Sequence, residues 1–217
     1  MEGSAEARMG AMMPAMGREL DFFISLVSTY TYLAVNRADE VASREGVTLR
    51  WRPFNVRAIM VEQNNRPFVG KPAKLQYMWR DLERRAAGYL CDFPQRPAYP
   101  LKNFDLANRI AVVAAREGWC PDYVRTTYAR WFGLGEESGS EPNASASLRD
   151  VGQDPARVLA LAQSDEIGRA YDEATAEAKS LGIFGAPTFV TRGEMFWGDD
   201  RLEDAVRWHA QGTLLRR

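Results

Sequence analysis

Four hydroxyl-bearing residues, Ser28-Thr29-Tyr30-Thr31, stand between an apolar segment and a helical pattern. A helix beginning here would present unpaired N–H groups and the positive end of its dipole, which together favour a bound anion. Ser is also among the best helix N-cap residues, so Ser28 taken alone is expected to be a cap. One hydroxyl can both cap a helix and donate to an anion, and this stretch by itself leaves both roles open.

A second group of chemically interesting residues lies near the end of the chain. Pro187, within GIFGAPTFV, comes just before an expected strand, and an X-Pro bond is where a cis peptide costs least. Asp199 and Asp200 follow the next expected strand and open the last helix, where carboxylates suit the helix dipole. Taken alone, these residues would be a turn proline and a pair of helix caps.

Composition and charge argue against several classes of function. The chain has 217 residues and a formal net charge of −1, which gives no long-range field for nucleic acid or an anionic membrane. No apolar run approaches the ~18 residues of a membrane-spanning helix. The single histidine, His209, and two distant cysteines, Cys91 and Cys120, argue against a metal site, a Ser-His-Asp triad and a disulfide framework. We expect a cytoplasmic protein, since two unpaired thiols suit a reducing compartment.

Hydrophobic alternation and turn signals predict α/β segments at the two ends of the chain. Residues 20–27, 30–45 and 47–54 are predicted as strand, helix and strand, a βαβ unit with a right-handed crossover. Residues 186–199 are predicted as a hairpin turning at Arg192-Gly193, and residues 201–211 as the last helix. The order βαβ followed by ββα is the thioredoxin topology.

The middle of the chain contains helical periodicity and no convincing strand. We predict a polar loop at 133–147. We also predict helices at 72–89, about 106–118, 123–131, 155–163 and 165–181. The predicted fold is therefore an α/β, thioredoxin-like fold with a large all-helical insertion. Its predicted organisation is a flexible leader at 1–18, a thioredoxin-like domain from 19–65 and 182–217, and a helical insertion domain at 66–181.

Three motifs resemble the 2-hydroxychromene-2-carboxylate isomerases, relatives of the DsbA-like proteins and kappa-class glutathione transferases. They are STYTYLA from Ser28, PAK-x-x-Y-M-x-RDLER from Pro72, and GIFGAPTF-x-x-x-GEMFWGDDRLE from Gly182. Several family members carry Pro and Ser where this chain has Thr29 and Thr31. The resemblance spans about residues 20–211, and it implies glutathione as cofactor and a homodimer.

The resemblance also implies roles for individual residues. Ser28 would be the catalytic residue, donating a hydrogen bond to the glutathione sulfur. This role suits the physics, since a helix N-terminus and a hydroxyl donor both lower the pKa of a thiol. The remaining implied glutathione contacts are Ala186, Pro187, Trp197, Gly198, Asp199, Asp200, Asn64, Asn65 and Lys71, with Lys74 as a further candidate. An aromatic-derived small-molecule substrate would contact Tyr30, Tyr77 and Tyr99.

The implied reaction is an isomerisation in aromatic catabolism, in which glutathione thiolate adds to a conjugated carbonyl compound, a bond rotates, and glutathione leaves. The first alternative is a kappa-like glutathione transferase or peroxidase that acts on another electrophile. The second is a non-catalytic thioredoxin-fold binding module. A thiol–disulfide oxidoreductase is disfavoured, because the motif at the start of the first helix contains no cysteine.

Overall fold

Four strands form the central sheet, in the order β2-β1-β3-β4. β1 (Glu19–Ile24) runs parallel to β2 (Thr48–Pro53) and antiparallel to β3 (Thr188–Thr191). β3 in turn pairs with β4 (Glu194–Trp197) in a hairpin that turns at Arg192-Gly193, as the sequence predicts. The computed structural model describes residues 19–65, 68 and 70–215, so the predicted leader at 1–18 lies outside the described residues.

Aromatic side chains join the two sequence-distant parts of the sheet. Phe22 on β1 and Phe189 on β3 are register partners, and their rings stack with centroids 4.6 Å apart. On the other side, Phe22 packs against Trp51 of β2 with centroids 4.8 Å apart. Phe22 and Phe189 are fully buried, so this row of rings holds the first and last segments of the chain in one core.

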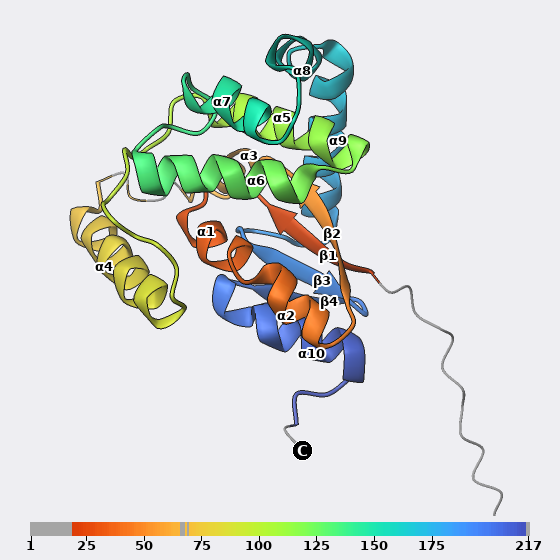
Figure 1. Cartoon of the computed structure of the whole chain (residues 1–217). Helices are drawn as coiled ribbons and strands as arrows, with labels where there is room; N and C mark the ends of the chain where they lie inside the picture. The colour runs from red at the N-terminus through yellow and green to blue at the C-terminus, as the bar shows by residue number, and fades with distance from the viewer. Residues whose placement is uncertain (1–18, 66–67, 69, 216–217) are drawn as a thin grey trace, which may run out of the picture.

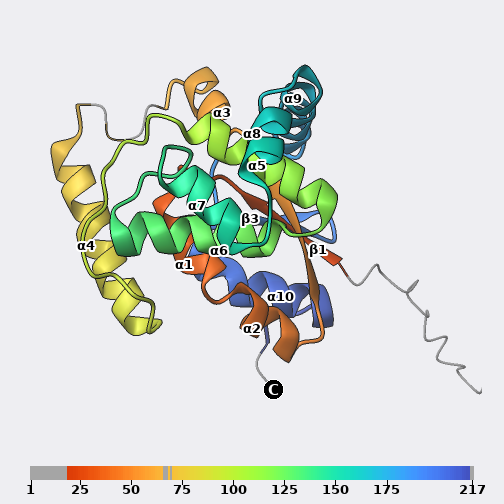
Figure 2. The ribbon, with the colours of Figure 1, turned by 45° about the horizontal axis from the view of Figure 1, so that its top comes forward.

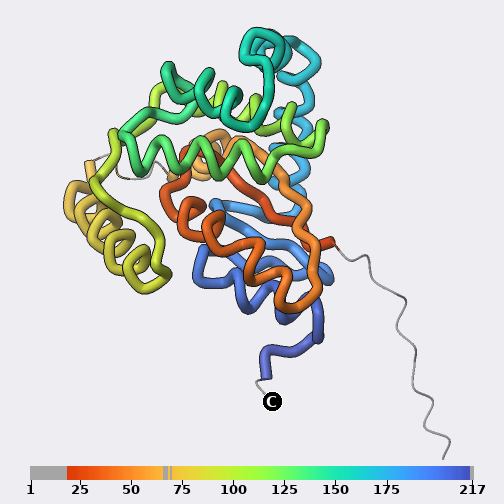
Figure 3. Tube along the Cα trace, in the orientation of Figure 1, coloured from red at the N-terminus to blue at the C-terminus, as the bar shows by residue number. Residues whose placement is uncertain are grey.

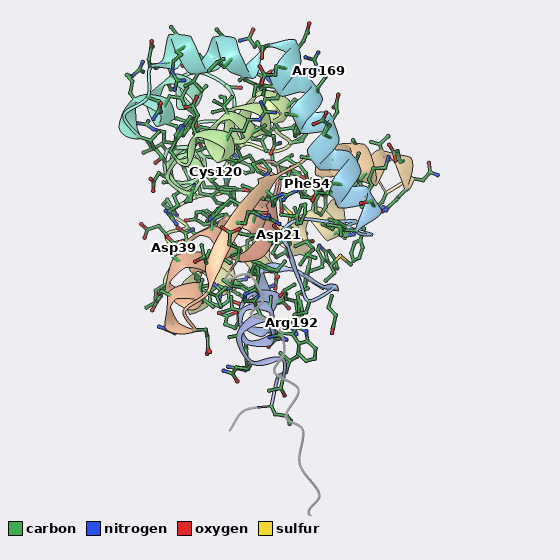
Figure 4. All side chains as sticks on the ribbon, turned by 90° about the vertical axis from the view of Figure 1, so that its right-hand side faces the viewer. Asp21, Asp39, Phe54, Cys120, Arg169 and Arg192 are labelled. Atoms are coloured by element: carbon green, nitrogen blue, oxygen red, sulfur yellow. The ribbon has the colours of Figure 1, made fainter. Side chains whose placement is uncertain are left out.

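Helices from both ends of the chain cover the sheet, as Figure 1 shows. α1 (Thr29–Val35) and α2 (Ala38–Arg44) follow β1, and α10 (Leu202–Gln211) follows β4 through the 3₁₀ turn η2 (Asp199–Arg201). α2 contacts β2, whereas α10 contacts β3 and β4. Arg192, in the hairpin turn, lies beside α10 in Figure 4, where it donates hydrogen bonds to the His209 carbonyl oxygen.

In its described part, the segment between the two halves of the sheet contains helices joined by irregular stretches, and no strand. It comprises α3 (Val56–Glu62), α4 (Pro72–Gly88), α5 (Phe104–Glu117), α6 (Cys120–Ala129) with the π-helical turn η1 (Arg130–Leu134), α7 (Asn143–Asp150), α8 (Pro155–Ala162) and α9 (Asp165–Ser180). Figures 2 and 3 show α5 to α9 gathered above the sheet and α4 standing apart, beside α1. No helix within the described ranges is long and apolar enough to cross a membrane.

Three local predictions differ from the structure. The helix predicted at 30–45 is two helices, because Asn36 ends α1 and its side-chain amide donates to the Tyr32 carbonyl oxygen. α3 was not expected from the sequence at all. The polar loop predicted at 133–147 ends inside α7, whose buried Asn143 donates hydrogen bonds to the carbonyl oxygens of Thr127 and Glu136. The predicted domain boundaries at residues 65 and 181 stay a prediction.

Candidate functional site

Ser28 caps the N-terminus of α1, directly after β1. Its backbone is extended, with φ −87° and ψ 118°, and its Oγ accepts a hydrogen bond from the Thr31 N–H at 3.3 Å. The Ser28 hydroxyl donates to the Ala186 carbonyl oxygen at 2.7 Å, across 158 positions of sequence. One lone pair thus serves the cap, while the hydroxyl proton is directed to the segment before β3.

The segment before β3 contains the expected cis proline. The Ala186–Pro187 peptide bond is cis, which confirms the prediction made for Pro187. Ser28 and Ala186 therefore meet at the point where the two halves of the sheet join. This places a hydroxyl, a helix N-terminus and the backbone before a cis proline within one small region.

The helical segment fixes the loop that carries Ser28. The Tyr128 hydroxyl on α6 lies 2.8 Å from the Ser28 carbonyl oxygen and 3.1 Å from the Ser25 carbonyl oxygen. Asn108 on α5 accepts a hydrogen bond from the Leu26 N–H at 2.9 Å. Tyr128 and Asn108 are buried, and because buried polar bonds are costly to leave unmade, they hold this turn in one conformation.

A cavity of about 240 Å³ opens beside Ser28, and most of its walls are apolar. Val27, Val56, Met60, Met78 and Trp197 supply the apolar walls. The polar side chains that reach it, besides Ser28 and Thr29, are Tyr30, Arg57, Asn65, Lys74 and Tyr99. An apolar cleft with a few polar groups is typical of a small-molecule site.

A second cavity, of about 320 Å³, shares Tyr30, Ala186 and Trp197 with the first. Its lining includes Tyr30, Arg85, Ala186, Pro187, Trp197, Gly198, Asp199, Asp200 and Arg201. Gly198 has φ 115°, a conformation that favours glycine, and a Cβ there would lie 2.5 Å from Asp200 Oδ1. Gly198 therefore lets the Asp200 carboxylate come close to the backbone at the mouth of this cavity.

Asp199 and Asp200 occupy very different surroundings. Asp199 is 1% exposed, and its Oδ2 lies 2.8 Å from Arg85 Nη2, an ion pair without favourable hydrogen-bond geometry. Arg37 lies 3.9 Å from the same oxygen and donates to the Asp199 carbonyl oxygen at 2.7 Å. Burial raises the pKa of Asp199 to about 7, although the two arginines act to lower it. The Asp200 side chain, by contrast, is about half exposed.

The two cavities bring together most of the residues implicated by the sequence. Tyr30 lines both cavities, and its hydroxyl donates to Asp81 Oδ2 at 3.0 Å. Burial raises the Tyr30 pKa, with Asp81 adding to the effect, so this phenol stays protonated. Tyr77, Asn64 and Lys71 line neither cavity, and the Tyr77 side chain is 61% exposed beside Arg84.

The sequence did not predict that two arginines, Arg57 and Arg85, line the cavities. Arg57 lies on α3, which has only seven residues and no recognisable period. Arg85 lies on α4 within a run of charged residues, which is usually a solvated face. No local signal marks either residue, because only the tertiary fold brings α3 and α4 to Ser28 and Asp199. Within the ranges that the structure describes, no cluster of metal-binding side chains occurs.

The sheet order, the serine at the head of α1 and the cis proline before β3 define a thioredoxin-fold protein that lacks the usual cysteine. Residues 19–207 match the family model described as the DSBA-like thioredoxin domain. The chain belongs to this family. The predicted α/β, thioredoxin-like fold with a helical insertion is thus confirmed.

Characterised relatives are similar over nearly the whole chain. The 2-hydroxychromene-2-carboxylate isomerase of Sphingobium xenophagum is 26% identical over 190 residues, which cover 87% of this chain and 96% of that protein. Glutathione S-transferase kappa 1 of Caenorhabditis elegans is also 26% identical, over 88% of this chain and 89% of that protein. A solved structure of a 2-hydroxychromene-2-carboxylate isomerase superposes with a TM-score of 0.73 at 26% identity, covering 85% and 90% of the two chains.

Proposed function

We propose that this protein is a glutathione-dependent isomerase of 2-hydroxychromene-2-carboxylate-type ring-cleavage products. The observation that carries the proposal is the position of the Ser28 hydroxyl. It stands at the N-terminus of α1, in hydrogen-bond contact with the residue before a cis proline, at the edge of an apolar cavity. The similarity to isomerases of that name supports this choice of reaction.

The residues around the cis proline suit glutathione along its length. Ala186 offers a backbone carbonyl to an extended peptide, in the manner of an added strand. On one side, Asp200 offers a carboxylate to the γ-glutamyl ammonium, and Arg85 offers a cation to the carboxylate of the same unit. On the other side, Asn65 and Lys74 reach the first cavity, where the glycyl end would lie. When bound, glutathione supplies a thiolate that adds reversibly to a conjugated carbonyl and leaves again after bond rotation.

Binding of glutathione can change the hydrogen bond that the Ser28 hydroxyl donates. The Ser28 hydroxyl now donates to the Ala186 carbonyl oxygen. A peptide N–H that pairs with this carbonyl would compete for it and free the Ser28 proton. The freed O–H then stabilises a neighbouring thiolate, while the Thr31 N–H continues to hold Oγ in place. Ser28 thus lowers the pKa of a bound thiol without taking part in disulfide exchange.

The proposed reaction is tested by absorbance with 2-hydroxychromene-2-carboxylate, in the presence and absence of glutathione. The proposal predicts conversion to the other isomer only with glutathione, and no net consumption of the cofactor. Isothermal calorimetry should also detect glutathione binding at millimolar concentration or below. Absence of that binding would contradict every glutathione-dependent function for this protein.

The similarity to glutathione S-transferase kappa 1 supports one alternative, transfer of glutathione to an electrophile. Mass spectrometry distinguishes the two reactions, because a transferase leaves a stable conjugate and an isomerase leaves none. The homodimer stays a prediction that size-exclusion chromatography with light scattering would test. The cytoplasmic location also stays a prediction.

A further inference from the structure

Arg57 is a cation in the wall of the Ser28 cavity. It projects from α3 and is partly buried. Its Nη2 donates to the Tyr99 hydroxyl oxygen at 3.2 Å, and its guanidinium carbon lies 6.0 Å from the Tyr99 ring centroid and 5.8 Å from that of Phe104. The Arg57 guanidinium thus contacts the faces of two aromatic rings and one phenol oxygen.

Among the residues that the structure describes, no carboxylate forms an ion pair with Arg57. Arg52 and Arg85, by contrast, each have a carboxylate partner. Arg52, at the end of β2, lies 3.7 Å from Asp21, and Arg85 lies 2.8 Å from Asp199. A partly desolvated guanidinium has five N–H donors and gains most from a bidentate carboxylate. Among the described residues, the cavity therefore contains a cation that is available to a carboxylate brought by a ligand.

Tyr99 supplies a second donor at the same place. Burial raises the Tyr99 pKa, so its hydroxyl keeps its proton at neutral pH. Because the Tyr99 oxygen accepts from Arg57, its O–H remains available to donate. The ring is held by an edge contact to Trp79, with centroids 5.9 Å apart and an interplanar angle of 86°. The guanidinium and the phenol together offer donors to a single carboxylate.

We propose that Arg57 and Tyr99 form a subsite for the carboxylate of the electrophile, separate from the surface that binds glutathione. The inference rests on the proposed function of this cavity and names the residues that determine its selectivity. The carboxylates of glutathione have other cations within reach, Arg85 at the γ-glutamyl end and the exposed Lys74 at the glycyl end. The aromatic rings around Arg57 fit instead a planar, conjugated acid.

The test compares an acid with its neutral isostere in a protein already loaded with cofactor analogue. The unreactive S-methylglutathione is saturating, and calorimetry measures the binding of trans-cinnamate and of cinnamamide. A hydrogen bond to a charged group is worth about 1.5–3 kcal/mol, so wild type should bind cinnamate about 10- to 100-fold more tightly than cinnamamide. Arg57→Met should abolish this preference, and Tyr99→Phe should reduce it several-fold.

Three controls keep the result specific to Arg57. Arg57→Lys, which keeps the charge, should retain part of the preference for cinnamate. Lys74→Met removes the second cation among the described residues that line the cavity, and it should leave the preference within about twofold. The affinity of Arg57→Met for S-methylglutathione should be within about twofold of the wild-type affinity. Circular dichroism should show that Arg57→Met and Lys74→Met are folded.

Each contrary outcome has a distinct meaning. Equal binding of cinnamate and cinnamamide to loaded wild type would overturn the inference alone. Loss of S-methylglutathione affinity in Arg57→Met, matching the loss of cinnamate affinity, would also overturn it by assigning Arg57 to the cofactor. Loss of the preference in Lys74→Met but not in Arg57→Met would do the same. Failure of wild type to bind S-methylglutathione would instead contradict the proposed function.

Discussion

The two cavities that share Ala186 differ in how their charged side chains are paired. Beside one cavity, Arg85 forms an ion pair with Asp199, and Arg37 lies 3.9 Å from Asp199 and forms an ion pair with Glu203. Around Ser28, the walls are apolar, and Arg57 has no carboxylate partner within the described part of the chain. A region whose charges are matched internally is suited to hold a zwitterion and a fixed geometry. A region with an unmatched cation is suited to receive an anion.

The pH dependence of stability should show the largest effect, and it concerns Asp199. Burial raises its folded-state pKa from the ordinary 3.8 to about 7, so the fold favours the protonated form. Protonated Asp199 therefore makes its full contribution to the free energy of unfolding below about pH 4, and this contribution is lost as the pH rises through about 7. Each pKa unit corresponds to about 1.4 kcal/mol, so wild type should lose about 4 kcal/mol relative to Asp199→Asn over that window.

Urea denaturation of wild type and Asp199→Asn at a series of pH values measures this change. Asp204→Asn controls for removing a carboxylate charge from the same segment. An advantage of wild type that grows with pH would contradict the prediction. It would mean that the attraction of Arg85 and Arg37 for the ionised carboxylate outweighs the cost of burial.

The next largest effect should come from Ser28→Ala, which removes the proposed thiolate donor. Turnover should fall about 100-fold, the scale of one hydrogen bond to a charged group, while stability falls by about 1 kcal/mol for the lost cap. Ser164→Ala is the matched control, because Ser164 caps α9 by accepting from the Ile167 N–H at the same distance of 3.3 Å. Ser164→Ala should lose similar stability and keep full turnover. Equal turnover in the two variants would make Ser28 a cap and nothing more.

A smaller effect is expected for Asp200→Asn, on the charged side of the cis proline. Loss of the carboxylate that would meet the γ-glutamyl ammonium should weaken glutathione binding about tenfold by calorimetry. Asp204→Asn is the control, since Asp204 forms an ion pair with the same neighbour, Arg201, at 2.8 Å and lines neither cavity. If both variants bind glutathione like wild type, Asp200 serves only the local ion pairs.

The sequence predicts the parts of this fold that have strong local signals. Alternating residues mark β2, the Arg192-Gly193 turn marks the hairpin, and Pro187 marks the cis bond. α3 escaped prediction because seven residues are too short to display a helical period. α7 was not predicted because its polar sequence resembles a loop, and the buried hydrogen bonds of Asn143 are visible only in the structure.

The candidate site divides in the same way. Ser28 and Asp200 stand at element boundaries, where the local chemistry of caps draws attention to them. Arg57 and Arg85 lie within helices, and their roles can be inferred only from the residues that the fold brings into contact with them. Pairs such as Arg57 with Tyr99, or Arg85 with Asp199, join residues 42 and 114 positions apart, and no pattern in one sequence reports them.

The most direct test of the account is the pKa of the glutathione thiol when it is bound to the protein. Ultraviolet absorbance of the thiolate, titrated with pH, measures it in wild type, Ser28→Ala and Ser164→Ala. We predict that wild type and Ser164→Ala lower the thiol pKa by at least about one unit from its ordinary ~8.5, and that Ser28→Ala returns it most of the way. A bound thiol that titrates at its ordinary pKa in wild type, or identically in all three proteins, would contradict the central role given to Ser28.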